Sequence, residues 1–217
     1  ETTMANRSTS GFGLRMAMKL GNSPAVSGQS KYAIKSGLGV GIFKGNPASI
    51  QLAGDTGYIQ DSAFSTTDDG NDGGIDFTTA NDALLVGVHN GVFYIDGTTS
   101  KPTFANSVAA STTFGTNPNT NSTDGVAFVN DDPDQEYVVK ADAAVGQALF
   151  GLCGNMNDFA AGDAKDGAST ATFDSGTQGE TKMFRIVRSA EDPDNEDLTA
   201  AGANIIVVIN AAANTYR

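Results

Sequence analysis

Strand-forming runs broken by turn residues are the feature that most constrains how this chain folds. The segment LLVGVHNGVFYID at 84–96 holds two apolar runs on either side of His89 and Asn90, with a glycine directly after the pair. Runs rich in valine, isoleucine and aromatic residues that end at Asn, Asp or Gly are typical of β-strands. We therefore expect either a hairpin or one long bulged strand here.

The same pattern recurs along most of the chain. Residues 14–20, LRMAMKL, alternate between apolar side chains and polar or small ones, as expected of a half-buried strand. No segment keeps a long helical apolar period, and only 143–155 suggests a short helix. Further strands are expected over residues 30–37, 39–47, 48–60, 125–142, 181–189 and 203–211.

These patterns predict an all-β fold: a single β-sandwich or β-barrel-like domain with long loops, a minor helix and a possible extended N-terminal arm. The 26 glycines suit the many turns that such a fold needs. Within one domain we distinguish residues 1–47, an N-terminal arm or set of strands, from an all-β body over 48–217. Two long polar stretches, 61–82 and 97–125, are expected to be loops, and loops of this length often bind ligands.

Two acidic segments, DDPD at 131–134 and EDPDNED at 191–197, could be calcium loops, a catalytic carboxylate pair or turns. Neither has the alternating ligands, central glycine and closing glutamate of a helix–loop–helix calcium site, and DDGNDGGID at 68–76 also misses that spacing. Proline presets φ for the first central position of a type I turn, and aspartate accepts hydrogen bonds from free backbone N–H groups. We expect turns, with no specific metal site.

The chain has one cysteine and one histidine, which removes most familiar catalytic machinery. Cys153 lies in the apolar stretch ALFGLCGN, where a buried packing thiol is expected. His89 is expected to be a strand or turn residue, and no G-x-S-x-G motif accompanies it. We therefore expect no enzyme activity and no cofactor.

The net charge of −12 is unevenly distributed. Residues 1–50 carry six basic side chains and one acidic one, whereas residues 51–217 carry seven basic and 24 acidic ones. The acidic part should repel duplex DNA, so no nucleic acid partner is expected, while the basic first quarter suits an acidic protein neighbour. The longest apolar run, 205–209, is too short to span a bilayer, and the start lacks the apolar region of a secretory signal.

Five segments, taken in order, resemble one family of proteins: the small head proteins of tailed bacteriophages that are assigned as capsid decoration or cement proteins. VGVHNGVFYIDGTTSKPTFANS is similar to the family's central "GVFxGCxYxDxxxxKPxFSN", and GVAFVNDDPDQEYVVKADA to its "AYVxDDPxxxFEVQAD". The resemblance covers most of the chain, although the end NAAANTYR lacks the family's closing histidine and 61–82 has no counterpart. The remaining matches are GFGLRMAMKLGNSP with SKYAIKSGLGVGIFKGNPASI, KMFRIVRSAEDPDNED and ANIIVVINAAA.

The resemblance implies a structural virion protein that binds the outer surface of the assembled capsid and stabilises it. Its partner would be the major capsid protein, with self-association as a dimer or trimer on the lattice, and it would assemble in the host cytoplasm. Residues 5–47 would then carry much of the contact. The expected apolar anchors are Phe12, Leu14 and Tyr32, and the expected partners of acidic shell residues are Arg7, Arg15, Lys19 and Lys31.

Two other functions are compatible with the same sequence. One is a tail, neck or head-fibre component, present in few copies per particle. The other is a carbohydrate-binding or adhesin module that uses the long loops, for which Phe104 and Phe114 are the aromatic candidates.

Overall fold

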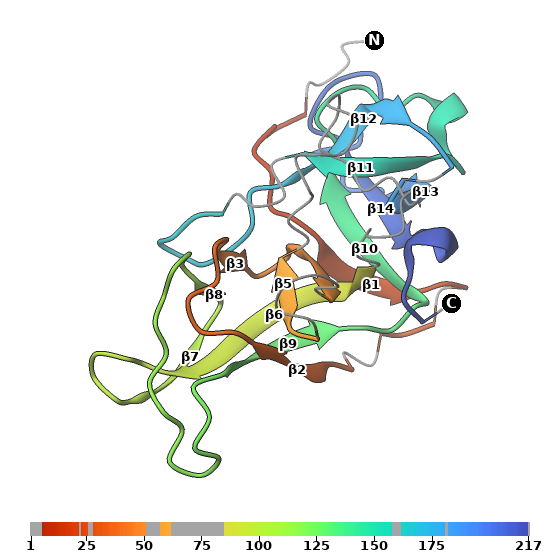
Figure 1. The fold of residues 1–217 in the computed structure, drawn as a ribbon. Helices are drawn as coiled ribbons and strands as arrows, with labels where there is room; N and C mark the ends of the chain where they lie inside the picture. The colour runs from red at the N-terminus through yellow and green to blue at the C-terminus, as the bar shows by residue number, and fades with distance from the viewer. Residues whose placement is uncertain are drawn as a thin grey trace.

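The computed structural model describes residues 6–21, 23–25, 28–50, 57–61, 85–157, 162–180 and 182–216, which are almost entirely strands and turns. The predicted all-β class is therefore confirmed. Open antiparallel sheets form a sandwich-like fold (Figure 1). The strands are β1 (Arg15–Lys19), β2 (Ser30–Ile34), β3 (Ile42–Phe43), β4 (Pro47–Ile50), β5 (Ile59–Asp61), β6 (Leu85–Ile95), β7 (Pro102–Ala105), β8 (Ser107–Val108), β9 (Gly125–Asn130), β10 (Gln135–Lys140), β11 (Cys153–Asn157), β12 (Thr172–Gln178), β13 (Phe184–Ser189) and β14 (Asn204–Ile209).

Two sheets carry most of these strands. The first has the order β1-β10-β14-β13-β11-β12, and the second has the order β2-β9-β6-β4-β5, with β7 also paired to β6. All pairings between these strands are antiparallel. In the second sheet the terminal strands β2 and β5 approach each other, so that this sheet curls toward a barrel. Strands β3 and β8 form a separate short ladder.

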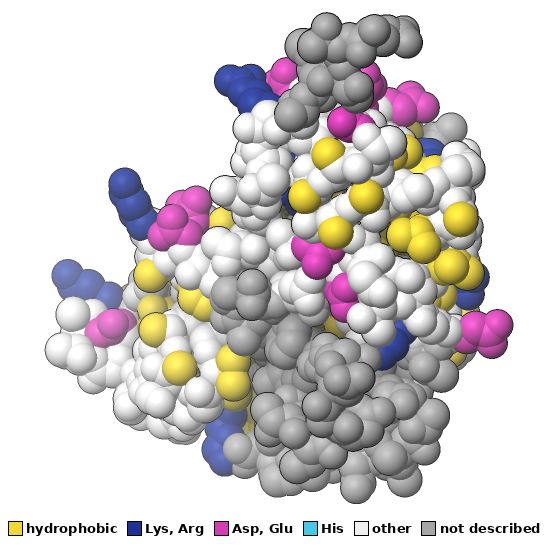
Figure 2. Space-filling model, turned by 90° about the horizontal axis from the view of Figure 1, so that it is seen from above, with side chains coloured by type: hydrophobic (Ala, Val, Ile, Leu, Met, Phe, Trp, Pro, Cys, Tyr) yellow, Lys and Arg dark blue, Asp and Glu magenta, His cyan; other side chains and the backbone are white. Residues whose placement is uncertain are grey.

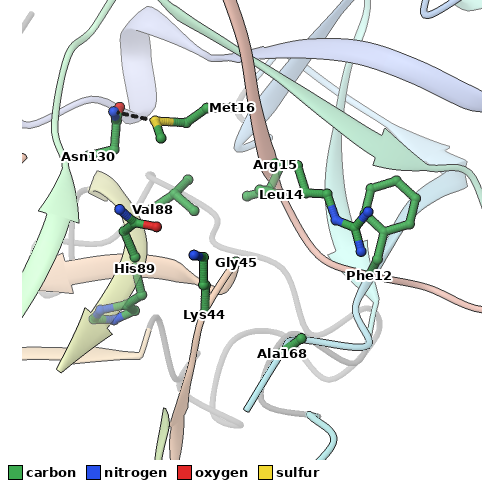
Figure 3. A pocket seen from close by; sticks show the side chains of 11 residues that line it. Phe12, Leu14, Arg15, Met16, Lys44, Gly45, Val88, His89, Asn130 and Ala168 are labelled. Carbon is green, nitrogen blue, oxygen red and sulfur yellow. Dashed lines mark hydrogen bonds between the residues drawn. The ribbon is translucent and has the colours of Figure 1, made fainter. Parts of the chain in front are cut away.

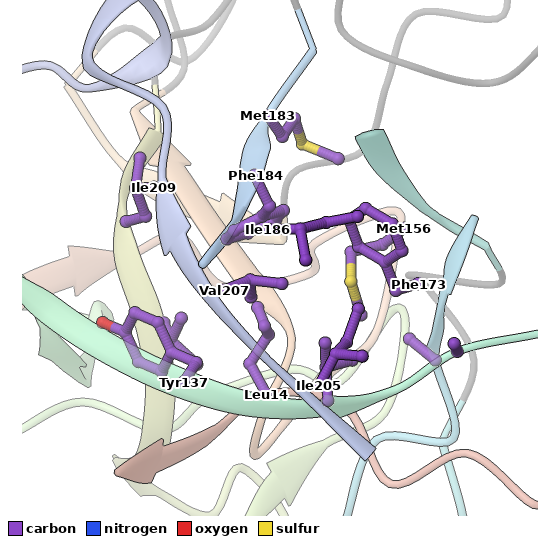
Figure 4. Close-up of a cluster of buried hydrophobic side chains, with 14 of the residues drawn as sticks. Leu14, Tyr137, Met156, Phe173, Met183, Phe184, Ile186, Ile205, Val207 and Ile209 are labelled. Carbon is purple, nitrogen blue, oxygen red and sulfur yellow. The ribbon is translucent and has the colours of Figure 1, made fainter. Parts of the chain in front are cut away.

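Each sheet encloses its own hydrophobic cluster, and β6 contributes to both. Leu85 and Val88 face the first cluster, whereas Val86 and Val92 face the second. Strand β14, NIIVVI, is buried along its whole length between β10 and β13, which explains its unbroken apolar run (Figure 4). Burial on both sides of β6 makes this strand the shared wall of the two cores.

Strand β6 is one long bulged strand rather than a hairpin. Its register against β9 shifts between His89 and Gly91, and Gly91 has a φ of 141°. An extra residue at this point lets the strand bend from one core to the other. Of the two alternatives that the sequence left open, the structure shows the bulged strand.

Both acidic segments are turns, as predicted. The carbonyl of Asp132 accepts the N–H of Gln135 at 3.1 Å, and that of Asp192 accepts the N–H of Asn195 at 2.9 Å. In each turn the side chain of the same aspartate also accepts the N–H two residues on, at 3.0 Å and 3.1 Å. The first turn joins β9 to β10, and the second lies between β13 and β14.

Three expectations about loops and helices need correction or qualification. The stretch 97–125 is not a single loop, because β7 returns to pair with β6 and β8 pairs with β3. The expected helix within 143–155 is only a 3-10 turn at Gln147–Leu149, and a second such turn spans Ala211–Ala213; the described residues form no α-helix. The expected loop 61–82 lies outside the described residues, apart from Asp61 at the end of β5.

The N-terminal quarter is built into both sheets. Strand β1 pairs with β10 in the first sheet, and β2 pairs with β9 in the second. An arm is therefore confined to residues before Arg15, and the described part of it, 6–14, lies against the body of the protein through the contacts given below.

Gly87 is where β6 and β9 approach most closely. A Cβ at this position would lie 1.9 Å from the carbonyl oxygen of Asn130, which is backbone and cannot move aside. We predict that Gly87→Ala lowers the free energy of unfolding by about 3 kcal/mol, because the two strands must separate. Gly146→Ala is the matched control, since nothing lies within 4 Å of its added Cβ. Equal denaturation midpoints for the two variants would contradict this account of the sheet.

Candidate functional site

Residues 6–14, here called the N-terminal segment, are fastened to the turn and loop before β14. The Arg7 guanidinium pairs with the Asp194 carboxylate at 2.9 Å, and the Arg7 N–H donates to the Asp194 carbonyl at 3.0 Å. The Asn6 amide donates to the carbonyls of Asp197 and Ala201, both at 2.9 Å. The first described residues are therefore bound to the second acidic turn and its neighbours.

A buried lysine completes this attachment. Lys140, at the end of β10, is 3% exposed. Its ammonium group donates to the carbonyls of Ser8 at 2.9 Å and Gly202 at 3.0 Å, and to the side-chain oxygen of Asn195 at 3.3 Å. Burial lowers the pKa of Lys140, while the nearby Asp192 carboxylate raises it. Three acceptors match the three hydrogens of an ammonium group, so the buried charge is fully satisfied.

Glycines bring the next part of the segment close to the body. A Cβ on Gly11 would lie 2.0 Å from the carbonyl oxygen of Thr170, and Gly13 has a φ of 67°. The Gly13 N–H donates to the Ala171 carbonyl at 3.0 Å, and the Leu14 N–H donates to the Gly45 carbonyl at 2.9 Å. These contacts fix the path by which the chain enters β1.

The segment, together with the start of β1, forms one wall of a cleft of about 300 Å³ between the two sheets (Figure 3). The start of the bulge in β6 forms the opposite wall, and the residues between β3 and β4 close one end. We call it the N-terminal cleft. It is lined by Phe12, Leu14, Arg15, Met16, Lys44, Gly45, Val88, His89, Asn90, Asn130 and Ala168.

The N-terminal cleft combines an apolar floor with cationic groups. The Arg15 guanidinium lies over the Phe12 ring at 4.2 Å from its centroid, an arrangement that leaves its N–H edge free. Lys44 is exposed and extends between the two walls (Figure 3). Within the described part of the chain, no lining residue is acidic and Lys44 forms no ion pair. In a chain of net charge −12 this is a local positive region.

The seven residues predicted to contact a shell lie in different surroundings in the structure. Phe12 and Arg15 line the cleft, and Lys31 is exposed on the second sheet. The prediction that Leu14 is a surface anchor is wrong. Its side chain is 3% exposed and packs in the first core. Its alternation pattern indicated a strand but not which sheet its inner face would meet.

Three more of the residues predicted to contact a shell, Arg7, Lys19 and Tyr32, already have partners within the chain. Arg7 pairs with Asp194 and Lys19 pairs with Asp132, so the two acidic turns themselves supply carboxylate partners for the basic N-terminal quarter. Tyr32 packs against the second core, and its hydroxyl bonds to Asp131 at 2.8 Å and to Tyr216 at 2.6 Å. Its burial and these bonds raise the pKa of Tyr32.

Sequence reasoning missed Lys44, Val88 and Asn90 as cleft residues. The only local signal was the FKGN turn, which places an exposed lysine beside Gly45 at the end of a strand. Val88 and Asn90 reach the cleft through the bulge in β6, whose register depends on β9.

Side-chain charges of opposite sign lie close together elsewhere on the molecule. In Figure 2, some of the Lys and Arg side chains on the face seen from above have an Asp or Glu beside them. The Arg188 guanidinium, for example, binds both carboxylate oxygens of the buried Glu136, each at 2.6 Å. Among the described residues, neither Arg15 nor Lys44 forms such an ion pair.

A second exposed feature is a row of three phenylalanines on the outward face of the second sheet. Phe104 of β7 is 74% exposed, and its ring centroid lies 4.5 Å from that of Phe93 and 6.4 Å from that of Phe128. Phe114 is not an exposed loop aromatic as expected. It is 4% exposed, and its ring centroid lies 4.8 Å from that of Tyr94, on which it stacks. Of the two, only Phe104 offers a surface.

Neither reactive side chain is placed for catalysis. Cys153 is buried, and burial raises the pKa of its thiol, as expected of a packing cysteine. His89 is 1% exposed, and its Nε2 lies 3.2 Å from the Gln60 carbonyl, which makes this nitrogen the donor. Within the described ranges, no three His, Cys, Asp or Glu side chains are grouped so that they could hold a metal ion.

Comparisons with known proteins return no match: no family model, no curated protein and no solved structure is significantly similar to this chain. A search of the described residues for helices long and apolar enough to cross a membrane finds none.

His89 makes the stability of the fold depend on pH. Burial lowers the pKa of His89 from 6.5 to about 4, so the unfolded chain takes up this proton at a higher pH than the folded one does. Stability from this group is therefore complete above pH 6.5 and is lost as pH falls toward 4, by on the order of 3 kcal/mol. Denaturation measured from pH 7 to 4 should show this slope, and His89→Gln should flatten it. An unchanged slope in the variant would mean that other groups cause it.

Proposed function

We propose that this chain is a structural virion protein that binds the outer surface of an assembled phage capsid and stabilises it. The observation that carries the proposal is the N-terminal cleft: an apolar, cationic hollow on an otherwise strongly acidic chain, built from the N-terminal quarter. Surfaces of opposite charge favour association and exclude wrong partners. The order of the five sequence segments that resemble decoration proteins supports the same function.

Decoration requires binding and no chemistry. A protein that binds the assembled shell but not the free subunit adds its binding free energy to the stability of the shell. The features of this chain suit that role, since its histidine and its cysteine are both buried in the fold. The proposed partner is the major capsid protein, reached in the host cytoplasm during assembly, with the chain bound as single copies, dimers or trimers on the capsid exterior.

Head binding should depend on the free cations of the cleft. We predict that Lys44→Glu and Arg15→Glu each weaken co-sedimentation of the purified protein with heads that lack it by roughly tenfold, because each reverses a charge at the contact. Lys101→Glu is the control, since Lys101 is exposed on the β6–β7 turn and carries the same charge change. Binding that is unaffected by all three substitutions would place the contact elsewhere, and the absence of any head binding would overturn the proposed function.

Phe104 supports carbohydrate binding as a second candidate function. A phenylalanine that is 74% exposed, next to two more aromatic rings, is unusual on a surface with no partner. Aromatic faces beside polar groups are typical of ligand sites, and the amides of Asn90 and Asn106 border this row.

Substitution of Phe104 separates the two candidate functions. We predict that Phe104→Ala leaves head binding unchanged, because Phe104 is not part of the N-terminal cleft. If the chain is instead a glycan-binding module, the wild type will be retained on immobilised neutral polysaccharide and the variant will not. Retention on polysaccharide without head binding would replace decoration by this second function.

A further inference from the structure

The N-terminal cleft has an unpaired strand edge along one side. Strand β1 is the terminal strand of the first sheet, with β10 on one side only. Among the described residues, no strand pairs with its other edge over residues 15–18. Leu14, Arg15 and Met16 are consecutive, and all three line the cleft. Since successive side chains of a strand point to opposite faces, the edge itself faces the cleft.

Free backbone groups on an edge strand are a template for another extended chain. Natural edge strands that stay free are usually blocked by charges or proline. Here the edge carries Met18, which is 49% exposed, and Leu20 beyond it is 39% exposed. The same strand also carries Arg15 and Lys19, so the edge combines exposed apolar side chains with cations. A partner strand that brings carboxylates would suit such an edge better than an uncharged one.

The chemistry of the cleft selects the charge of that strand. Arg15 and Lys44 stand on two of its sides, and none of the lining residues that the structure describes is a carboxylate. Asn130 offers nothing to a ligand, because its amide donates to the Gly28 carbonyl at 3.0 Å and its side-chain oxygen accepts from Tyr137 at 2.9 Å. Among the described lining residues, the polar contacts open to a ligand are thus mainly cationic, beside the partly exposed apolar side chains of Phe12 and Met16.

We propose that the N-terminal cleft binds an extended acidic polypeptide segment of a partner protein. The segment pairs with the free edge of β1, places an apolar side chain beside the partly exposed Phe12 and Met16, and sets a carboxylate between Arg15 and Lys44. This inference rests on the proposed function in one respect: the partner that would carry the segment is the capsid subunit.

Two other occupants fit less well. Nucleic acid needs many phosphate contacts, and two cations on a chain of net charge −12 do not supply them. A second copy of this chain would bring its own net charge of −12 against that of the first, and Asp132 and Asp194 of its acidic turns are already paired with Lys19 and Arg7. An acidic segment from a different protein meets neither obstacle.

The test uses the intact protein and a labelled peptide of about ten residues in which Glu alternates with Val around one central Phe. We expect saturable binding by fluorescence anisotropy that weakens as salt is raised, since the charge contact is screened. Amide NMR shifts should concentrate at residues 15–18 and at Asn90. Two matched peptides, one with Lys for Glu and one with Ala for Phe, should bind at least roughly tenfold more weakly.

Two variants keep the inference falsifiable. Lys44→Glu should lower the affinity roughly tenfold, whereas Lys101→Glu should leave it unchanged. Lys44 is exposed, so an unaltered NMR spectrum outside the cleft will show that the variant is folded. Equal binding of the Lys and Glu peptides, or shifts that map away from β1, would overturn the inference. So would a concentration-dependent dimer that Lys44→Glu abolishes and the peptide displaces, because the occupant would then be a second copy.

The outcomes for this inference and for decoration can be told apart. Heads that bind the protein without any response to the acidic peptide would overturn the peptide site and leave decoration standing. Peptide binding by a protein that does not sediment with heads would overturn decoration and leave an acidic-peptide site with another partner.

Discussion

The buried ammonium group of Lys140 is the interaction on which the candidate site depends. It joins three parts of the chain that are far apart in sequence: Ser8 in the N-terminal segment, Asn195 in the second acidic turn and Gly202 before β14. Leaving a buried carbonyl without a partner costs about 1–3 kcal/mol. Detachment of the N-terminal segment would therefore be opposed at several groups at once. Because the segment is held there, Phe12, Leu14 and Arg15 form a wall instead of a free tail.

The contacts of the N-terminal quarter also explain where charges of opposite sign are paired. The basic first quarter and the acidic remainder partly neutralise each other, through Arg7 with Asp194 and Lys19 with Asp132. Among the described residues, Arg15 and Lys44 form no ion pair, and both lie at the cleft between the sheets. The uneven charge of the sequence thus has two roles in this account: it fastens the N-terminal segment, and it leaves a small positive region for a partner.

Local patterns predicted most of the elements, although not β7 and β8 within the expected loop 97–125, and they did not predict the site. The apolar run of β14, the bulge after His89 and the two Asp-Pro-Asp turns depend on neighbouring residues, and each was predictable. The cleft depends on contacts between distant segments, such as Leu14 with Gly45, which no local period encodes. The same reason explains two errors. The sequence predicts a surface anchor at Leu14, but this side chain is buried in the first core. It also offers Phe114 as an exposed loop aromatic, but this ring stacks on Tyr94.

The position of this chain in the virion tests the central claim most directly. Cryo-EM of the particle whose genome encodes it should show the chain in many copies on the outside of the head, with the N-terminal cleft facing the major capsid protein and an extended segment of that protein beside β1. Density for the chain only at the neck, the tail or a fibre, or on the shell with the cleft turned to solvent, would contradict the account.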